Sequence, residues 1–538
     1  MTNADTNVAD YVIVGAGAAG PVLAARLSEN PEVTVVLLEA GGENTDDRGR
    51  MQGAFFLLWG GEADWGYATT AQPELNGRQI YVPRGRVMGG STAINVGAWL
   101  RGSQADYDGW AGLVGDKGWA FENALRVFRQ IEDTDRGPSE WRGSGGPVGM
   151  ADLPAPTALA DTLLEGFTEA GYGPRGDVDA ESPYVADRYQ TIFPEGYRQT
   201  IADAYLGEDV RSRPNLTIIT RAFARRVSFD GTRATGVVYR KDGRDHEVSA
   251  TREVVLSAGA INTPQLLMLS GVGPAGHLRE HGIDVVADAP GVGENLQDHL
   301  FAPVRGVARP GVEGSYPANT DEATLAEWRA GRTGPAAYWQ QNGVGFVATT
   351  PGLPGPDFEL MFQYNPDLGD GTLFSGEDIA GRSGYTIAAI LLQPRSRGTV
   401  RLASTDPEEH PVIDPRYLSH PEDLATFVRG LRASHKITQS PSLAPYTEQV
   451  HPPVDASDEV YEKLVRDDAT TAFHPVGTAK MGDSSDPFAV TDPQLRVRGV
   501  QGLRIADASV FPTIIRGHTM APTVFVAERA AELLRTAQ

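Results

Sequence analysis

Near its N-terminus the chain reads Tyr11-Val12-Ile13-Val14-Gly15-Ala16-Gly17-Ala18-Ala19-Gly20, and this stretch decides the fold. The short apolar run at residues 11–14 predicts a buried strand, and the sequence after the glycines, with Leu23 and Leu27 in helical spacing, predicts a helix. A second predicted strand, residues 33–38, is followed directly by Glu39. This order of strand, turn, helix and strand opens a doubly wound α/β sheet.

The three glycines form the pattern G-x-G-x-x-G between a predicted strand and a predicted helix. Gly15 allows a tight turn, Gly17 lets the backbone approach a pyrophosphate, and Gly20 lets the helix pack closely on the strand. The helix N-terminus attracts the phosphate charge. Glu39, at the end of the second strand, is suited to bind both ribose hydroxyls. The pattern predicts a dinucleotide site, and by itself it does not choose between FAD and NAD.

Length and composition bound the class of protein. A chain of 538 residues exceeds what one hydrophobic core usually serves, so two domains are expected. The net charge of −23 disfavours nucleic acid or an anionic membrane as a partner. With no cysteine, disulfides and thiolate metal sites are excluded, and no Cys/His cluster has metal-ligand spacing, so no metal is expected. Residues 1–10 lack a signal-peptide pattern and no apolar run approaches the roughly 20 residues of a membrane span, so we expect a cytoplasmic protein with no membrane span.

The remaining sequence falls into two regions that differ in composition and in their predicted elements. Strands are predicted at residues 216–220, 226–229, 235–239 and 254–256, followed by a helix at 263–269, and a final helix is predicted at about 521–535. Residues 300–460 hold Pro- and Gly-rich loops, alternating strands such as 358–364 and 385–393, and a helix at 423–438. We therefore expect an α/β fold (α+β overall), with a Rossmann-like nucleotide-binding domain and an inserted antiparallel-sheet domain.

Five longer stretches match one known set of signatures in sequence and in order. They are residues 84–95 (RGRVMGGSTAIN), 259–274 (GAINTPQLLMLSGVGP), 291–299 (GVGENLQDH), 473–478 (FHPVGT) and 503–509 (LRIADAS). Together with the glycine turn they extend from residue 9 to about residue 535. In these stretches the chain resembles the glucose-methanol-choline (GMC) oxidoreductase family.

The resemblance implies that the dinucleotide is FAD and that the second domain covers the flavin ring. It divides the chain into a FAD-binding domain at 1–150, 200–300 and 462–538 and a substrate-binding domain at 151–199 and 301–461. In some family members a histidine of the first signature bonds covalently to the flavin. The corresponding residue here is Ile94, so we predict non-covalent FAD. Besides Gly15, Gly17, Gly20 and Glu39, the resemblance implies FAD contacts from Val87, Gly89, Gly90, Asn95, Val96, Gly97, Ala224, Phe473, Asp507, Ala508, Thr519 and Met520.

Two histidines are the candidate catalytic residues. Oxidation of an alcohol by a flavin requires removal of the hydroxyl proton while hydride leaves the carbon for flavin N5, and histidine is a suitable proton acceptor. By the resemblance, His474 occupies the family's catalytic histidine position and His518 the second position, which is histidine or asparagine in different members. We expect His474 to accept the proton and His518 to hydrogen-bond the same oxygen. The other eight histidines are expected to be surface or core residues.

The substrate is less defined by the sequence. The chain looks most like choline oxidase and bacterial choline or alcohol dehydrogenases, and choline recognition needs a carboxylate beside aromatic faces. In the stretch that corresponds by the resemblance, residues 341–346, glycine stands where the acid is expected, which favours an uncharged primary alcohol. The candidate pocket aromatics are Trp65, Tyr67, Phe346, Phe362 and Phe473.

Three functions follow from the resemblance. The preferred one is an FAD alcohol oxidase that reduces oxygen to hydrogen peroxide. The first alternative is an alcohol or choline dehydrogenase that uses another electron acceptor. The second is a hydroxynitrile lyase, since such lyases share the fold and keep FAD without redox use. A Ser-His-Asp hydrolase is disfavoured because the G-x-S-x-G pattern is absent. The oligomeric state is not readable from the sequence.

Overall fold

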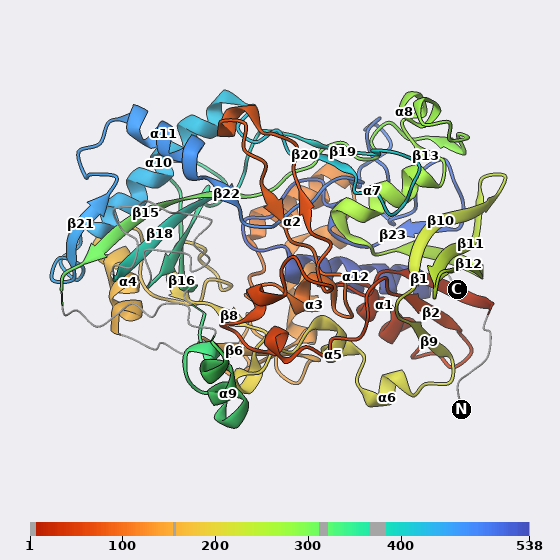
Figure 1. Ribbon diagram of the computed structural model, residues 1–538, viewed down its shortest axis with the longest axis horizontal. Coiled ribbons are helices and arrows are strands. Elements are labelled where there is room, and N and C mark those ends of the chain that lie inside the picture. The colour runs from red at the N-terminus through yellow and green to blue at the C-terminus, as the bar shows by residue number, and fades with distance from the viewer. Residues whose placement is uncertain (1–6, 154–157, 311–320, 340, 365–382, 537–538) are drawn as a thin grey trace.

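Two large β-sheets, each with its own hydrophobic core, form the computed structural model of the protein (Figure 1). The structure describes residues 7–153, 158–310, 321–339, 341–364 and 383–536, so most of the N-terminal segment 1–10 lies outside the described residues. The first sheet lies on the right of Figure 1 and the second on the left. The α/β fold class predicted from the sequence is confirmed.

The first sheet has the order β10-β11-β12-β1-β2-β9, with β23 paired to β12. The strands β9, β2, β1 and β12 are mutually parallel, and β23 adds in parallel to β12. The long β12 also continues into an antiparallel ribbon with β11 and β10. The strands are β1 (Val8–Val14), β2 (Val35–Leu38), β9 (Leu216–Ile219), β10 (Phe223–Asp230), β11 (Arg233–Lys241), β12 (Arg244–Leu256) and β23 (Leu503–Ile505).

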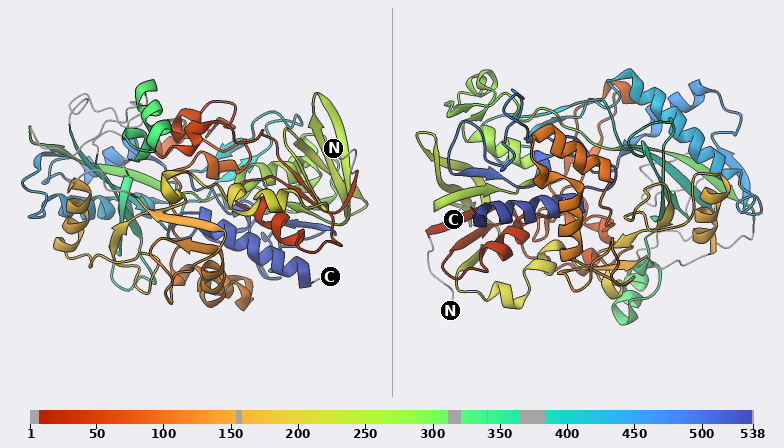
Figure 2. Two further views of the ribbon diagram at one scale, coloured as in Figure 1. Left: turned by 90° about the horizontal axis from the view of Figure 1, so that it is seen from below. Right: turned by 180° about the vertical axis from the view of Figure 1, so that it is seen from behind.

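Two helices from opposite ends of the chain pack together against this sheet. The helix α1 (Gly20–Leu27) begins in the glycine turn, and its small residues let the last helix, α12 (Met520–Thr536), lie alongside it (Figure 2). Arg26 of α1 donates hydrogen bonds to Glu528 of α12. The pair fixes the start of α12 close to the turn that follows β1. The predicted helix at 263–269 is present within α7 (Gly259–Leu269).

The second sheet is antiparallel and has the order β21-β15-β18-β17-β16-β7, with β22 paired to β15. Three helices, α4 (Ala158–Glu169), α10 (Pro421–Thr438) and α11 (Asp458–Asp468), pack with one face of this sheet, and the other face is turned toward the first sheet. The strands are β7 (Ala186–Arg188), β15 (Leu300–Ala308), β16 (Gln341–Val347), β17 (Phe358–Gln363), β18 (Gly384–Leu391), β21 (Thr447–His451) and β22 (Thr470–Thr471).

Two of the expected domain boundaries fall inside secondary-structure elements. The boundary expected at 461/462 falls inside α11, which packs on α10 and β15, and β22 joins the second sheet. The chain therefore leaves the second sheet only after Thr471, three residues before His474. The boundary expected at 150/151 falls inside β6 (Val148–Asp152). Among the described residues, no helix has both the length and the apolar character that crossing a bilayer requires.

Arg101 and Glu132 form a buried ion pair. Glu132, at the end of α3 (Phe121–Ile131), is fully buried and accepts hydrogen bonds from the indole of Trp99 and the guanidinium of Arg101. Replacing Glu132 by Gln leaves the Arg101 charge without its counter-ion. We expect the Glu132→Gln variant to lose about 3–5 kcal/mol of unfolding free energy, measured by urea denaturation.

The matched control is the exposed pair Arg240–Glu408, whose side chains are 39% and 54% exposed. The Glu408→Gln variant should lose far less unfolding free energy than Glu132→Gln, because exposed ion pairs are well screened by water. Equal losses in the two variants would show that the buried pair has no special role in stability.

Candidate active site

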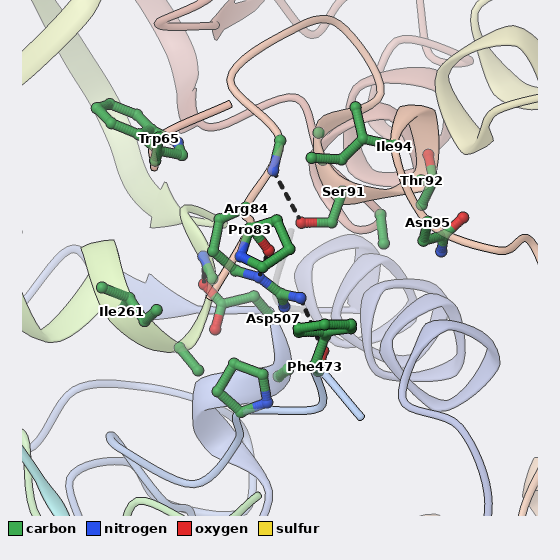
Figure 3. A pocket seen from close by; sticks show the side chains of 18 of the residues that line it. Trp65, Pro83, Arg84, Ser91, Thr92, Ile94, Asn95, Ile261, Phe473 and Asp507 are labelled. Atoms are coloured by element: carbon green, nitrogen blue, oxygen red, sulfur yellow. Dashed lines mark hydrogen bonds between the residues drawn. The ribbon is translucent and has the colours of Figure 1, made fainter. Parts of the chain in front are cut away.

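One cavity of about 300 Å³ extends from the glycine turn after β1 to His474 and His518. Its lining comes from both sheets: Val14 ends β1 in the first sheet, and Phe301, Met361 and Ile390 lie on the facing strands of the second. Figure 3 shows one part of this cavity, with Ile94 and Asn95 on one side and Phe473 and Asp507 on the other. The cavity is therefore formed where the two sheets meet.

The floor of the cavity is backbone packed against backbone. Gly15 has φ +99°, and a Cβ there would lie 2.5 Å from the carbonyl oxygen of Ser257. Gly90 has φ +53°, and a Cβ there would lie 2.6 Å from Cα of Gly17. Both positions therefore require glycine. A Cβ at Gly17 would make only an ordinary van der Waals contact, 3.9 Å from Cα of Gly90, and Gly17 lines the cavity, so its backbone can be approached by a bound group.

Glu39 lies at the end of β2 and lines the cavity. One carboxylate oxygen accepts a hydrogen bond of 2.8 Å from the Ala16 amide, and the other accepts one of 2.8 Å from the Gly41 amide. Burial raises the pKa of this carboxyl group to about 7. The carboxylate is thus oriented by the glycine turn, and each oxygen keeps a lone pair for a further donor.

Most of the residues predicted to contact the cofactor lie along this cavity, but four do not. Gly20, Val87, Gly89 and Gly97 are outside its lining. Their side-chain faces meet protein instead: a Cβ at Gly89 would touch Thr200, and one at Gly97 would overlap the Phe193 ring. The predicted residues that line the cavity are Gly15, Gly17, Glu39, Gly90, Asn95, Val96, Ala224, Phe473, Asp507, Ala508, Thr519 and Met520.

A buried arginine that the sequence analysis missed holds the loop carrying Asn95. Arg198 is fully buried and donates to the carbonyl oxygens of Gly49, Thr92 and Asn95 and to the Asn95 side chain. Its guanidinium lies 4.4 Å from the centroid of the Phe193 ring. Burial, and next the charge of Arg50, lower the pKa of Arg198 to about 9. This one side chain fixes the wall formed by residues 92–97.

Asp507 fixes another wall through hydrogen bonds to α7 and to its own turn. One oxygen accepts from the Gly259 amide at 2.9 Å and from the Thr263 hydroxyl at 2.6 Å, and the other accepts from Ser509. The side chain is buried beside the cavity, as Figure 3 shows. Because its oxygens are already engaged, Asp507 holds the turn that begins α7 against the residues preceding α12.

His474 and His518 are brought together by the two sheets. Their ring centroids are 4.7 Å apart, with the ring planes inclined at 47°. His474 follows β22 of the second sheet, and its backbone amide donates to the buried carboxylate of Asp298 at 2.8 Å. His518 lies two residues before the start of α12, which packs on the first sheet. The two rings therefore meet at the boundary between the sheets, at one end of the cavity.

The turn before His474 is held in an unusual backbone conformation. Phe473 has φ +65°, in the left-handed region that side chains rarely adopt. Its amide donates to the Thr471 hydroxyl at 2.7 Å, and its carbonyl accepts from Arg84 at 2.7 Å, as Figure 3 shows. Burial lowers the pKa of Arg84. These contacts aim His474 into the cavity.

His299, which the sequence analysis treated as an ordinary residue, sets the tautomer of His474. Its Nε2 lies 3.0 Å from the carbonyl oxygen of Leu392, which only accepts, so Nε2 carries the proton. Burial lowers the pKa of His299 to about 4, so the ring is neutral and Nδ1 is an acceptor. His474 Nδ1 lies 3.0 Å from it and must donate.

These contacts determine which ring nitrogen of His474 is free to react. Burial, then the charges of His518, His299 and Arg84, hold the pKa of His474 well below its usual value. The ring is neutral near pH 7, with its proton on Nδ1. Its Nε2 therefore carries a free lone pair, which is what a general base requires.

Two more residues near the histidines were missed. Glu359 of β17 lies 3.1 Å from His518 Nε2, and Tyr189 donates to the same carboxylate oxygen at 2.7 Å. The signal for Glu359 was a single acid inside the apolar run 358–362, because a buried carboxylate needs a partner. Within the described ranges, no three acidic or histidine side chains converge as a metal-binding group would.

An aromatic wall, here defined as Phe55, Phe56, Trp59, Trp339 and Phe473, lines part of the cavity. Trp59 contacts the Phe473 ring edge to face at 5.4 Å, and Trp339 contacts Phe55 at 4.8 Å. The Trp59 indole also donates to the Ile94 carbonyl at 3.0 Å. Of this group, only Phe473 was predicted from the sequence, although the run FFLLW at 55–59 was a visible signal.

The other predicted pocket aromatics occupy different places. Phe362 packs on Phe167 on the helix-covered face of the second sheet, because side chains alternate along β17 and Met361 takes the cavity side. Phe346 lies in the core beneath the lining. Trp65 does line the cavity, stacked on Tyr67 and beside Phe223. Phe346 and Phe362 are therefore not pocket residues.

Comparison with known proteins agrees with this architecture. A family model described as GMC oxidoreductase matches residues 9–301, and the model of its C-terminal part matches 394–527. The chain therefore belongs to the GMC oxidoreductase family. It is 41% identical to an uncharacterised GMC-type oxidoreductase of Mycobacterium tuberculosis, over 98% of this chain and 99% of that protein. It is 39% identical to an alcohol dehydrogenase [acceptor] of Pseudomonas putida, over 98% and 95%.

A solved structure has the same fold over nearly its full length. The crystal structure of pyridoxine 4-oxidase from Mesorbium loti superimposes with a TM-score of 0.89 at 31% identity, covering 98% of this chain and 99% of that one. The protein is thus an enzyme of the GMC oxidoreductase family, and one of its relatives is named alcohol dehydrogenase [acceptor].

The hydrogen-bond chain through His299 predicts a measurable tautomer. In protein labelled with ¹⁵N-histidine at pH 7, His474 should be neutral with its proton on Nδ1. In the His299→Phe variant the acceptor for that proton is lost, so we expect a large population of the Nε2-protonated form, which has no lone pair facing the cavity. The measurement is the ring ¹⁵N shifts, with the His474→Ala variant to assign the signal. An unchanged His474 tautomer in His299→Phe would contradict the role given to His299.

Proposed function

We propose that this enzyme oxidises an uncharged primary alcohol to the aldehyde, with FAD bound non-covalently, His474 as the proton acceptor and oxygen as the electron acceptor. The observation that carries the proposal is the single cavity that joins the glycine turn and Glu39 to the pair His474 and His518. Such a cavity can hold a dinucleotide along one part and present its reactive end to the histidines. The balanced reaction converts RCH₂OH and O₂ into RCHO and H₂O₂.

The residues of the cavity fit FAD. The turn at 15–20 presents backbone amides at a helix N-terminus for a pyrophosphate, and Gly17 leaves room for it. Glu39 has lone pairs for the ribose hydroxyls, and Asn95, Val96, Ala224, Asp507, Ala508, Thr519 and Met520 line the length that such a cofactor would occupy. Bound FAD would supply the two-electron acceptor for the hydride of the substrate carbon.

Non-covalent binding is proposed because Ile94, at the position where a histidine would bond, has no nucleophilic atom. Precipitation of the protein with acid should therefore release all of its flavin into the supernatant, where absorbance at the flavin bands measures it. Flavin that stays with the washed pellet would contradict this part of the proposal.

The chain's own part in the mechanism follows from the tautomers. His474 Nε2, kept unprotonated by the His299 contact, takes the hydroxyl proton of the alcohol. His518 donates a hydrogen bond to the same oxygen, which stabilises the negative charge that develops there. The aromatic wall excludes water and packs on the substrate carbon skeleton.

The substrate class follows from the lining around the histidines. Phe301, Met361, Ile390 and Trp339 are apolar, so they favour a carbon chain or ring. Among the lining residues that the structure describes, the acids are Glu39 and Asp507, and both are engaged at the glycine loops. Glu359, 3.1 Å from Nε2 of His518, lies outside this lining, so among the described residues the lining offers a quaternary ammonium no carboxylate beside the histidines. Gly343 gives no further guidance, since a side chain there would meet Leu164 and Phe362. A relative named alcohol dehydrogenase [acceptor] and a fold neighbour named pyridoxine 4-oxidase support an alcohol substrate.

The test is anaerobic mixing of the yellow protein with a panel of alcohols, followed by admission of air. We expect loss of the oxidised flavin absorbance with an apolar primary alcohol, and rapid recovery in air with release of hydrogen peroxide. Bleaching that persists in air would replace the oxidase by a dehydrogenase with another acceptor. If no alcohol bleaches the flavin, the redox proposal fails, and release of aldehyde from a cyanohydrin would identify a hydroxynitrile lyase.

Replacing His474 by Ala removes the proposed base. We expect kcat to fall by roughly 10²–10⁴-fold, because that is the usual contribution of a positioned general base. The variant should stay folded and yellow, since His474 binds its surroundings through its backbone amide as well as its ring. The control is His246→Ala, on the exposed part of β12, which should retain full turnover. Normal turnover in His474→Ala would contradict the assignment.

A further inference from the structure

A buried carboxylate lies behind His518. Glu359 is on β17, in the apolar run Phe358-Glu359-Leu360-Met361-Phe362, and it has no solvent exposure. One oxygen, Oε1, accepts a hydrogen bond of 2.7 Å from the Tyr189 hydroxyl and lies 3.1 Å from Nε2 of His518. The other oxygen, Oε2, is buried and has no hydrogen-bond partner among the residues that the structure describes. An isolated buried carboxylate is costly, so a nearby cation is required to keep it ionised.

The groups around Glu359 leave one candidate for that cation. Tyr189 is neutral, because burial holds the pKa of its phenol well above the usual value. His299 is neutral, and its Nε2 proton is engaged by Leu392. His474 is neutral and donates to His299. Arg84 donates to the carbonyl oxygens of Pro83 and Phe473. Among the described residues, His518 is the basic group within hydrogen-bond distance of Glu359.

The geometry also restricts what His518 can do. A carboxylate accepts only, so the His518 nitrogen that faces Glu359 carries a proton. If His518 were neutral, its other nitrogen, Nδ1, would be a bare acceptor. It would then compete with His474 for the alcohol proton instead of donating to the alcohol oxygen. Both functions of the histidine pair require that His518 carry two protons and His474 one.

We propose that Glu359 is a positioning residue, the buried counter-ion that holds His518 as an imidazolium so that its Nδ1–H donates to the substrate oxygen. This inference rests on the proposed alcohol oxidation for its catalytic consequence, and on the geometry alone for the charge state. Glu359 keeps His518 a cationic hydrogen-bond donor, and His299 keeps His474 a neutral base. Tyr189 holds the carboxylate in place.

The direction of two pKa values agrees with this arrangement. Burial acts to raise the pKa of Glu359, but its contacts with His518, followed by the hydrogen bond from Tyr189, outweigh burial and leave the net pKa lowered. Burial lowers the pKa of His474, and the charge of His518 is the next cause. A protonated His518 therefore helps to keep His474 unprotonated.

The first test is a double-mutant cycle on the holoenzyme, scored by kcat and KM across pH. Glu359→Gln should lower kcat about 100-fold with little change in KM, the loss typical of removing one donor to a developing oxyanion. In a His518→Asn background, where no imidazolium exists, the same substitution should cost nothing or should raise kcat, because it removes an unpaired buried charge. Independent, multiplicative losses in the two backgrounds would overturn the proposal.

The control for loss of a carboxylate is Glu253→Gln. Glu253 forms an ion pair with Arg504 between β12 and β23, and its side chain is 21% exposed. That variant should keep the kcat and the pH profile of the parent enzyme. Flavin content and melting temperature of each variant show whether it is folded.

The second test measures the charge state of His518 by NMR, without substrate turnover. In holoenzyme labelled with ¹³Cε1-histidine, the signal missing from His518→Asn belongs to His518. In the parent it should keep the cationic shift to a higher pH than in Glu359→Gln. If Glu359→Gln does not fold, Tyr189→Phe serves instead. Removing the competing donor leaves Glu359 freer to pair with His518, so the cationic shift should persist to the same or a higher pH.

The outcomes separate the two proposals. A neutral His518 at pH 7 in the parent would overturn the counter-ion role. The same holds if Glu359→Gln leaves the pH range of the cationic form unchanged, or if Tyr189→Phe shortens that range. Failure of every alcohol to reduce the flavin would reject the proposed oxidation, and the His518 signal would still decide the charge state.

Discussion

The close approach of two backbone loops, the turn after β1 at Gly17 and the loop at Gly90, is the constraint on which the rest of this structure depends. Cα of Gly17 and the side-chain face of Gly90 are so close that a single methyl group would lie within 2.6 Å of backbone. The Gly89 amide donates to the Ala16 carbonyl at 2.8 Å in the same contact. Because no side chain separates these loops, the wall at residues 92–97 and the turn after β1 share one cavity. Overpacking at such a contact displaces backbone, so the position of Asn95 and the shape of the cavity follow from it.

The histidine end of the cavity depends in turn on buried polar groups from the second sheet. Asp298 accepts from the amides of His299 and His474 and from the hydroxyls of Tyr417 and Thr471. A buried carboxylate with four donors is expensive to rearrange, since any displacement leaves unpaired charge. The strained turn at Phe473 persists for this reason. The first sheet positions the glycine-turn end of the cavity, and the second positions His474.

The sequence could predict what lies in continuous motifs. The glycine turn and Glu39 sit in local patterns whose residue types have a direct physical reason, whereas His474 was named through the family resemblance. The predicted strands and helices are present within a few residues of their ends, except that β12 begins at Arg244, well before the strand predicted at 254–256. Glu359, His299 and Arg198 could not be paired with their partners, because strand register and sheet order bring them together across 103 to 175 residues. Phe362 was misplaced for the same reason: the choice between Met361 and Phe362 depends on which face of β17 is turned to the cavity. A one-residue shift in register would exchange them.

The two histidines illustrate how one residue type performs two tasks. His474 and His518 lie 4.7 Å apart, and two imidazolium rings at that distance would repel each other. Their different partners remove this conflict: a neutral imidazole on one side and a carboxylate on the other. The charge of His518 is one cause of the lowered pKa of His474, so any pH profile of this site reports the pair rather than a single residue. The same contact gives a physical reason for a carboxylate at Glu359 inside the apolar run 358–362, since an apolar side chain there would leave His518 without this partner.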